Sequence, residues 1–387
     1  MIAIPLTLGV EEEYQIIDPK THDLTSYIQE FLETGKTVYP EGEFKAEFLQ
    51  SQVEVGSKIC RNIQEVRQEI IRLRRSARDV ARHAGLAVAA ASTHPFANWT
   101  KQEVTAGIRY KQLMEQMQGL ASQMLIFGFH IHVGFGGEEN NDLKIDVMNQ
   151  LRYFLPHLLA LSTSSPFWQG RRTGLKSYRS VIFEMLPRTG VAPIFHSFSD
   201  YHALINLLAK VGSIERDEQT GNPDGTRIWW DIRPHPKFGT LEVRISDICT
   251  KIDEAVCIAA LLQSICHKLI DLRKNNQSWR VYSSHQIAEN KWRAMRYGID
   301  GNLIDFGREQ EVAMRDLALE LMSLAEDSAR ELGCWNEVRY IETILNEGTS
   351  ADRQLKVYDQ AIQSGRSEQD ALNLVVDHLI EEYLAGY

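Results

Sequence analysis

The sequence lacks the glycine-rich motifs that most often hold nucleotides. It contains no GxxxxGK[ST] phosphate loop, and no GxGxxG follows an expected strand. The segment GRRTGLKS resembles a phosphate loop only superficially, because its spacing is wrong. A P-loop nucleotide site and a Rossmann dinucleotide site are therefore both unsupported.

Positive charge is also scarce. The chain has 42 Lys and Arg against 52 Asp and Glu, which gives a formal net charge of -10. Proteins that bind nucleic acid through its phosphates usually carry a basic surplus, so we expect no nucleic-acid partner. The segment RLRRSAR (72–78) lies in an amphipathic helical pattern, and we expect it to form a solvated helix face.

Long apolar runs and cysteine motifs are missing as well. No run approaches the roughly 20 residues that span a bilayer, and the first residues show no charged segment before a long apolar stretch. We therefore expect a cytoplasmic protein with no membrane partner. The five cysteines are odd in number and show no CxxC spacing, which predicts reduced and mostly buried thiols.

No internal repeat and no Pro/Gly/Ser-rich linker divides the chain, so residues 1–387 are expected to form a single domain. Apolar residues recur at helical spacing in several segments, and the C-terminal third is expected to be mostly helical. The expected helices cover approximately residues 62–83, 143–161, 201–211, 251–274, 283–297, 312–332 and 351–383.

Three consecutive glutamates lie within an expected strand near the start of the chain, in LGVEEEY (8–14). Alternation puts Glu11 and Glu13 on one face and Leu8 and Tyr14 on the other, and only Glu12 breaks the pattern. Two carboxylates roughly 7 Å apart repel each other, so water, a cation or a raised pKa must offset the repulsion. A solvated edge strand would also explain this charge.

Three further segments show the same division into an apolar and a polar face: FLQSQVEVGS (48–57), FGFHIHVGF (127–135) and GTLEVRISD (239–247). Their polar faces carry no lysine but hold Glu54, His130, His132, Glu242 and Arg244. This pattern predicts an α+β fold in which helices cover the apolar face of an antiparallel or mixed sheet and a ligand binds on the polar face.

The polar face allows two kinds of metal chemistry. Carboxylate oxygens select Mg2+ or Mn2+, which commonly bridge carboxylates and substrate phosphates. His130 and His132 could instead supply two imidazole ligands to zinc, as a metal-dependent amidohydrolase would need.

Eight segments, in order along the chain, resemble the glutamate-cysteine ligase type 2 family, which includes bacterial carboxylate-amine ligases. They are LGVEEEYQ, QVEVGSKICRNIQEVR, STHPF, RYKQL, FGFHIHVG, LSTSSPFWQG, WWDIRPHPKFGTLEVRISD and RAMRYGIDG. The region PEGEFKAEFLQSQVEVGS (40–57) looks most like the cyanobacterial-type glutamate-cysteine ligases. Residues 170–179 match more distant members poorly, which leaves the amine substrate open.

The resemblance implies a glutamine-synthetase-like catalytic fold, with a curved, mainly antiparallel sheet as the floor of the active site. It implies an enzyme that uses ATP and Mg2+, or Mn2+, to join the γ-carboxylate of L-glutamate to the amine of L-cysteine. The products would be γ-glutamylcysteine, ADP and phosphate, formed through an acyl phosphate in the first step of glutathione synthesis. A homo-oligomer is compatible with the sequence. The alternatives are a ligase for another amine, an amidohydrolase and a catalytically silent binding domain.

The resemblance also implies roles for individual residues. Glu11, Glu13, Glu54 and Glu242 match positions that hold metal and nucleotide phosphates, and His132 is a further metal ligand with His130 beside it. Arg244 is the first choice, and Arg233 the second, for neutralising the transferred phosphoryl group. The substrate candidates, each weighed against a structural role, are Thr93, His94, Arg109, Arg171, Arg172 and Arg179.

Overall fold

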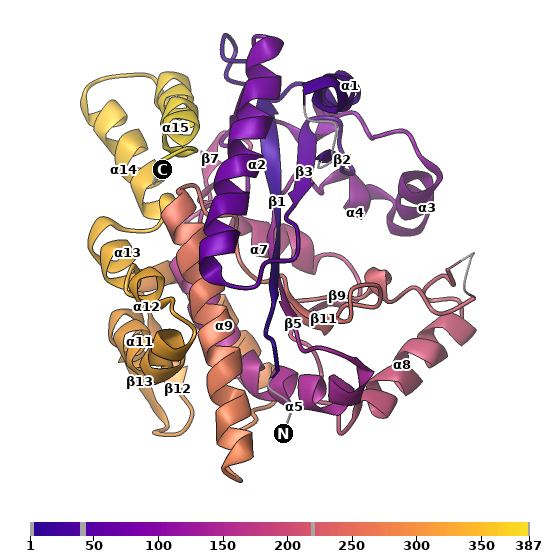
Figure 1. The fold of residues 1–387 in the computed structure, drawn as a ribbon. Coiled ribbons are helices and arrows are strands. Elements are labelled where there is room, and N and C mark those ends of the chain that lie inside the picture. The colour runs from indigo at the N-terminus through magenta and orange to yellow at the C-terminus, as the bar shows by residue number, and fades with distance from the viewer. Residues whose placement is uncertain (1–3, 39–43, 218–220, 386–387) are drawn as a thin grey trace.

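A seven-stranded sheet lies at the centre of the computed structural model, which describes residues 4–38, 44–217 and 221–385 (Figure 1). All of its strand pairs are antiparallel. In sheet order the strands are β10 (Ile232–Pro234), β11 (Thr240–Val243), β5 (Phe129–Gly134), β1 (Leu8–Ile17), β3 (Gln52–Gly56) and β2 (Phe44–Ala46), and β4 (Ala87–Ala89) pairs with the end of β1. Residues 40–43, which begin the segment PEGEFKAEFLQSQVEVGS, lie outside the described residues.

The register of these strands pairs polar residues that lie far apart in the sequence. The pairs are Glu13 with Glu54, Glu11 with His130, His132 with Glu242, and Glu242 with Arg233. Because paired residues in neighbouring strands point to the same face, the register gathers carboxylate, imidazole and guanidinium groups on one side of the sheet. The predicted α+β architecture with a polar sheet face is confirmed.

Helices cover the apolar face of the sheet (Figure 1). Helix α2 (Ile63–His83) packs on β1 and against α9 (Ile252–Lys274), and Asn62 caps α2 by accepting the backbone N–H of Glu65. By length and composition α9 is long and apolar enough to cross a membrane, so the expectation that no apolar run reaches this length is wrong. The apolar window of α9 is 78% buried inside the protein, as in a core helix.

Two of the predicted helical segments are divided in the structure. The segment at 143–161 forms two helices joined by a 3-10 turn, and the segment at 351–383 forms two helices separated by a turn at Gly365, whose φ is +85°. The segment at 312–332 begins as a strand. These elements are α5 (Asn141–Leu151), η3 (Arg152–Phe154), α6 (Leu155–Ser162), β13 (Gln310–Ala313), α11 (Met314–Glu331), α14 (Ser350–Gln363) and α15 (Glu368–Glu382).

The remaining elements are eight helices, four 3-10 helices and five short strands of the described residues, and these strands lie outside the seven-stranded sheet. The helices are α1 (Ile28–Val38), α3 (Ile108–Met117), α4 (Gly119–Ser122), α7 (Tyr178–Glu184), α8 (Phe198–Lys210), α10 (Ser284–Tyr297), α12 (Trp335–Val338) and α13 (Ile341–Glu347). The 3-10 helices are η1 (Trp99–Lys101), η2 (Glu138–Asn140), η4 (Gly225–Arg227) and η5 (Gly298–Asp300), and the strands are β6 (Phe167–Trp168), β7 (Arg171–Arg172), β8 (Thr189–Gly190), β9 (Trp229–Trp230) and β12 (Asn302–Asp305). All five cysteines are buried free thiols, as predicted.

The middle glutamate of the EEE trio belongs to the core. Glu12 faces the apolar side of the sheet and pairs with Arg74 of α2, and both side chains are almost completely buried. The hydroxyl of Tyr14 donates to Glu12 at 2.6 Å, and Arg74 also donates to the carbonyl groups of Cys249 and Tyr383. The expectation that residues 72–78 form a solvated face is therefore wrong for Arg74, because this side chain neutralises a carboxylate from another element.

Candidate active site

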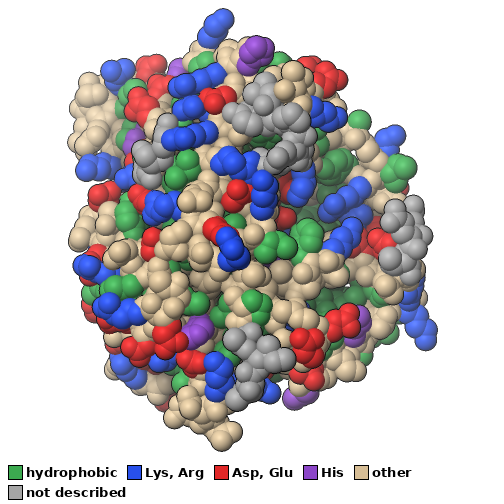
Figure 2. Space-filling view, viewed as in Figure 1, with side chains coloured by type: hydrophobic (Ala, Val, Ile, Leu, Met, Phe, Trp, Pro, Cys, Tyr) green, Lys and Arg blue, Asp and Glu red, His purple; other side chains and the backbone are tan. Residues whose placement is uncertain are grey.

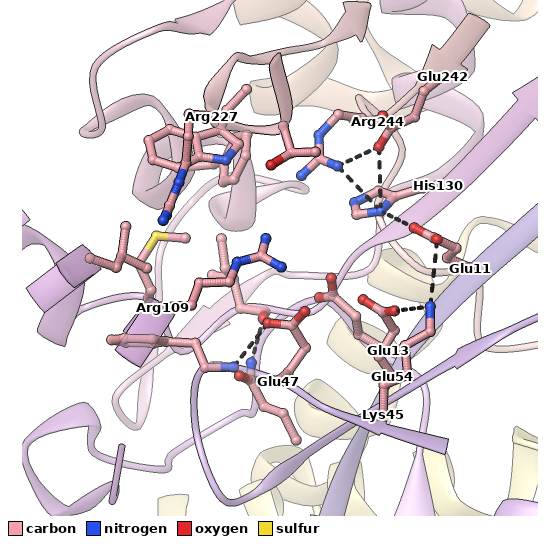
Figure 3. A pocket seen from close by; sticks show the side chains of 18 of the residues that line it. Glu11, Glu13, Lys45, Glu47, Glu54, Arg109, His130, Arg227, Glu242 and Arg244 are labelled. Atoms are coloured by element: carbon pink, nitrogen blue, oxygen red, sulfur yellow. Dashed lines mark hydrogen bonds and ion pairs between the residues drawn. The ribbon is translucent and has the colours of Figure 1, made fainter. Parts of the chain in front are cut away.

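A cavity of about 390 Å³ opens on the polar face of the sheet (Figure 3). On the face drawn in Figure 2, several Lys and Arg side chains surround a hollow in which acidic side chains are visible. Acidic side chains form the floor of the cavity, and apolar side chains form part of its wall. The apolar lining residues are Ala46, Phe48, Leu113, Met124, Ile126, Phe183, Leu186, Trp229 and Phe238.

Three carboxylates form a first group on this floor. Oxygens of Glu13, Glu47 and Glu54 lie within 4.8 Å of one another. Burial and the charge of Glu54 raise the pKa of Glu13 to about 7, and burial and both neighbours raise the pKa of Glu47 well above its usual range. Three converging oxygen ligands whose charges repel each other fit a hard divalent cation such as Mg2+ or Mn2+.

A second group combines two carboxylates with an imidazole. Ligand atoms of Glu11, His132 and Glu242 also lie within 4.8 Å of one another. The Nδ1 atom of His132 lies 3.0 Å from the hydroxyl of Thr240, whereas its buried Nε2 has no hydrogen-bond partner among the described residues and lies 3.6 Å from Glu11. This orphaned nitrogen beside two carboxylates fits a second divalent cation.

Two arginines hold Glu242. Arg233 donates to both of its carboxylate oxygens, at 2.7 and 3.3 Å, and Arg244 donates to it at 2.5 Å. Burial opposes ionisation of Glu242, but both guanidinium groups outweigh it and hold its pKa well below the usual range. Arg233 also donates to the carbonyl groups of Thr226 and Ile228, so its contacts orient Glu242. The Nε of Arg244 has no partner in the described part of the chain.

His130 lies beside this second group but is not part of it. Its Nδ1 lies 3.3 Å from Glu11 and 3.5 Å from Arg244. Burial, with the charge of Arg244, lowers the pKa of His130 to about 4, so the imidazole is neutral near pH 7. Burial also opposes ionisation of Glu11, but the neighbouring imidazoles of His130 and His132 outweigh it and hold the pKa of Glu11 well below its usual range. The candidate ion group contains His132 and not His130, so the pair of zinc-binding imidazoles that the alternative amidohydrolase would need is not assembled among the described residues.

Two of the substrate candidates line the cavity. Arg179 is buried and donates to the carbonyl groups of Ile245 and Arg244, at 3.5 and 3.2 Å. Arg109 is exposed, and its side chain points into the cavity from the side opposite His130 (Figure 3). A cation in this position can meet a carboxylate or a phosphate of a ligand.

The other four substrate candidates lie outside the cavity lining. Thr93 donates to the carbonyl of Phe167, and His94 accepts the backbone N–H of Ala97 in the turn after Pro95, so the contacts of both are structural. Arg171 and Arg172 form the exposed strand β7, and Arg172 pairs with Asp359 at 2.6 Å. Spacing in the sequence could not show that these four residues lie away from the cavity, because their positions depend on how the loops pack.

Several lining residues were not singled out from the sequence. Glu47 and Lys45 lie in or just after β2, where the hairpin to β3 brings them back beside Glu54. Arg227 and His235 lie next to β9 and β10. The segment EFKAEFLQ could have indicated Glu47, because a short hairpin before a polar strand brings the residues of the hairpin to the same face of the sheet as that strand.

Comparison with known proteins identifies the family. The sequence profile of glutamate-cysteine ligase family 2 (GCS2) matches residues 7–376. The chain belongs to this family. A protein from Herpetosiphon aurantiacus, named "Putative glutamate--cysteine ligase 2", is 49% identical over 99% of this chain and 94% of its own length. A protein of the same name from Roseiflexus sp. is also 49% identical, over 99% of this chain and 96% of its own length.

Solved structures show the same fold at much lower sequence identity. A glutamate–cysteine ligase from Francisella tularensis, solved in complex with AMP, has a TM-score of 0.70 and 15% identity over 99% of this chain and 90% of that one. A bifunctional glutathione synthetase from Pasteurella multocida has a TM-score of 0.63 and 13% identity over 98% of this chain and 52% of that one. The expected fold of the GCS2 catalytic domain is thereby confirmed.

Proposed function

We propose that this GCS2 protein joins the γ-carboxylate of L-glutamate to the amine of L-cysteine at the expense of ATP. The observation that carries the proposal is that all five carboxylates of the two acidic groups line one cavity beside Arg244: Glu11, Glu13, Glu47, Glu54 and Glu242. Family membership supports ligase chemistry. The related fold solved with AMP supports an adenine nucleotide as the second substrate.

The side chains of the cavity suit an acyl phosphate route. A carboxylate oxygen is a poor leaving group, so the γ-carboxylate attacks the terminal phosphorus of ATP, and ADP leaves. The amine then attacks the acyl phosphate and expels phosphate. Bound at the two acidic groups, Mg2+ would supply charge neutralisation for the phosphate oxygens. Arg244 stabilises negative charge on the transferred phosphoryl group, and Arg109 binds a substrate carboxylate.

Two observations support L-cysteine as the amine substrate. Residues 48–57 resemble the cyanobacterial-type glutamate-cysteine ligases, and part of the cavity wall is apolar. A small apolar pocket gains only about 1 to 3 kcal/mol from one substituent. We therefore expect 2-aminobutyrate, which has a methyl group in place of the thiol, to react about ten- to a hundredfold less efficiently than cysteine. Glycine should be poorer still, because it leaves the pocket empty.

The test is release of ADP and phosphate with glutamate, Mg2+ and each candidate amine, compared as kcat/KM. We expect turnover to require nucleotide, metal, glutamate and amine together, with cysteine best. If a simple alkyl amine outperforms cysteine, the protein is a carboxylate-amine ligase with another acceptor. Hydrolysis of a γ-glutamyl amide without nucleotide would instead identify an amidohydrolase and refute the ligase proposal.

A further inference from the structure

Lys45 lies at the junction of the two acidic groups. Its Nζ is 2.9 Å from Glu54 of the first group and 3.9 Å from Glu11 of the second (Figure 3). A lysine ammonium is charged near pH 7, so Lys45 places one positive charge between the two groups. Arg233 and Arg244 both donate to Glu242, so Lys45 supplies positive charge at a different point of the floor.

The side chain of Lys45 has the freedom to move. It is 53% exposed and extends from β2, the last strand in the sheet order. A lysine ammonium is a point charge on a flexible four-carbon chain, and it has no fixed bidentate geometry to lose. Although both carboxylates are mostly buried, the ammonium end of these ion pairs is exposed, so Lys45 can exchange the carboxylates for other partners.

Lys45 also lies on the boundary between two cavities. It lines the first cavity, and it lines a second one of about 500 Å³, which also includes Glu11, His132 and the backbone of several glycines. A Cβ atom built on Gly56 would lie 3.6 Å from the Nζ of Lys45, so the lysine extends over this glycine. An ammonium in this position can face a ligand in either cavity while staying close to the carboxylates.

We propose that Lys45 is a mobile counter-ion that exchanges carboxylates for substrate phosphate. Without metal, its ammonium neutralises Glu54 and Glu11. A divalent cation and an ammonium repel each other at the same carboxylates, so metal binding displaces Lys45, which then pairs with an anionic oxygen of the nucleotide phosphates. The inference rests on the proposed function, because it assumes that both ligands meet in this cavity.

This exchange predicts effects of opposite sign on the two ligands. Lys45→Gln should bind Mn2+ about three- to tenfold more tightly in the absence of nucleotide, because a competing charge is gone. Electron paramagnetic resonance of free Mn2+ measures this equilibrium. The same variant should bind a non-hydrolysable ATP analogue about tenfold more weakly at saturating Mg2+, as measured by calorimetry. Lys45→Arg keeps the charge and should shift Mn2+ affinity less than Lys45→Gln does.

Lys237→Gln is the matched control, because Lys237 lines the same first cavity and loses the same charge. It should change Mn2+ affinity by less than about twofold. Weaker or unchanged Mn2+ binding in Lys45→Gln would overturn the proposal, and so would unchanged binding of the analogue. If either of these results is found while the wild-type protein binds both Mn2+ and the analogue, the ligase function stands and only the role of Lys45 fails. If the wild-type protein binds neither Mn2+ nor the analogue, both proposals fail.

Discussion

At the scale of single residues, His94 shows how burial controls protonation. It is buried, its Nε2 lies 2.9 Å from the carbonyl of His22, and its Nδ1 accepts the N–H of Ala97 at 3.0 Å. Burial lowers the pKa of His94 to about 3, below the 6.5 of an ordinary histidine. Because the folded pKa is the lower one, the stabilising contribution of neutral His94 is present above about pH 6.5 and is lost as the pH falls towards 3.

We therefore expect wild-type protein to lose about 2 kcal/mol of unfolding free energy between pH 7 and pH 5, relative to His94→Asn. Asparagine has a hydrogen-bonding side chain that does not titrate, so it serves as the reference. The measurement is urea denaturation of both proteins at each pH. A stability difference that stays constant with pH would contradict this assignment and show that His94 keeps the same charge on unfolding.

At the scale of elements, neighbouring glutamates of strand β1 have different roles. Glu12 pairs with buried Arg74, whereas Glu11 faces the cavity. Glu12→Gln leaves a buried guanidinium without its counter-charge, so it should cost about 3 kcal/mol of stability while Mn2+ binding is kept. Glu11→Gln should keep stability to within about 1 kcal/mol and weaken Mn2+ binding at least tenfold. Chemical denaturation and Mn2+ titration of both variants test this division, and a reversal of the two effects would refute it.

At the scale of the whole molecule, the two acidic groups connect distant parts of the chain. Their members come from β1, from the β2–β3 hairpin, from β5 and from β11, which span residues 8–243. A cation bound only by the folded state stabilises it by about 2.7 kcal/mol at a hundredfold excess over Kd. For a chain of this length we expect Mg2+ or Mn2+ to raise Tm by about 3 °C.

Differential scanning calorimetry with and without metal measures this shift. Glu54→Gln is the control, because it removes one oxygen charge from the first group without touching the core, and its metal-induced shift should be smaller. A wild-type Tm that does not respond to either metal would show that the acidic groups do not bind a divalent cation.

The sequence by itself determined which residues share a face. Alternation along LGVEEEY, QVEVG, FHIHVG and TLEV placed Glu11, Glu13, Glu54 and Glu242 on polar strand faces, and the structure brings all four to one cavity. Helical spacing likewise predicted α2, α9 and α10 almost to the residue. These features follow from local backbone geometry, because side-chain direction repeats with a fixed period within a strand or helix.

Only the tertiary structure decided which residues meet across elements. Glu47 joins the first acidic group because a hairpin returns it to Glu54, and Arg74 is buried because Glu12 reaches it from another element. Thr93 and His94 are held in a turn, and Arg171 and Arg172 lie on an exposed hairpin, away from the cavity. Local spacing records the direction of a side chain relative to its own element, whereas burial, ion pairing and pKa depend on what the rest of the chain packs against it.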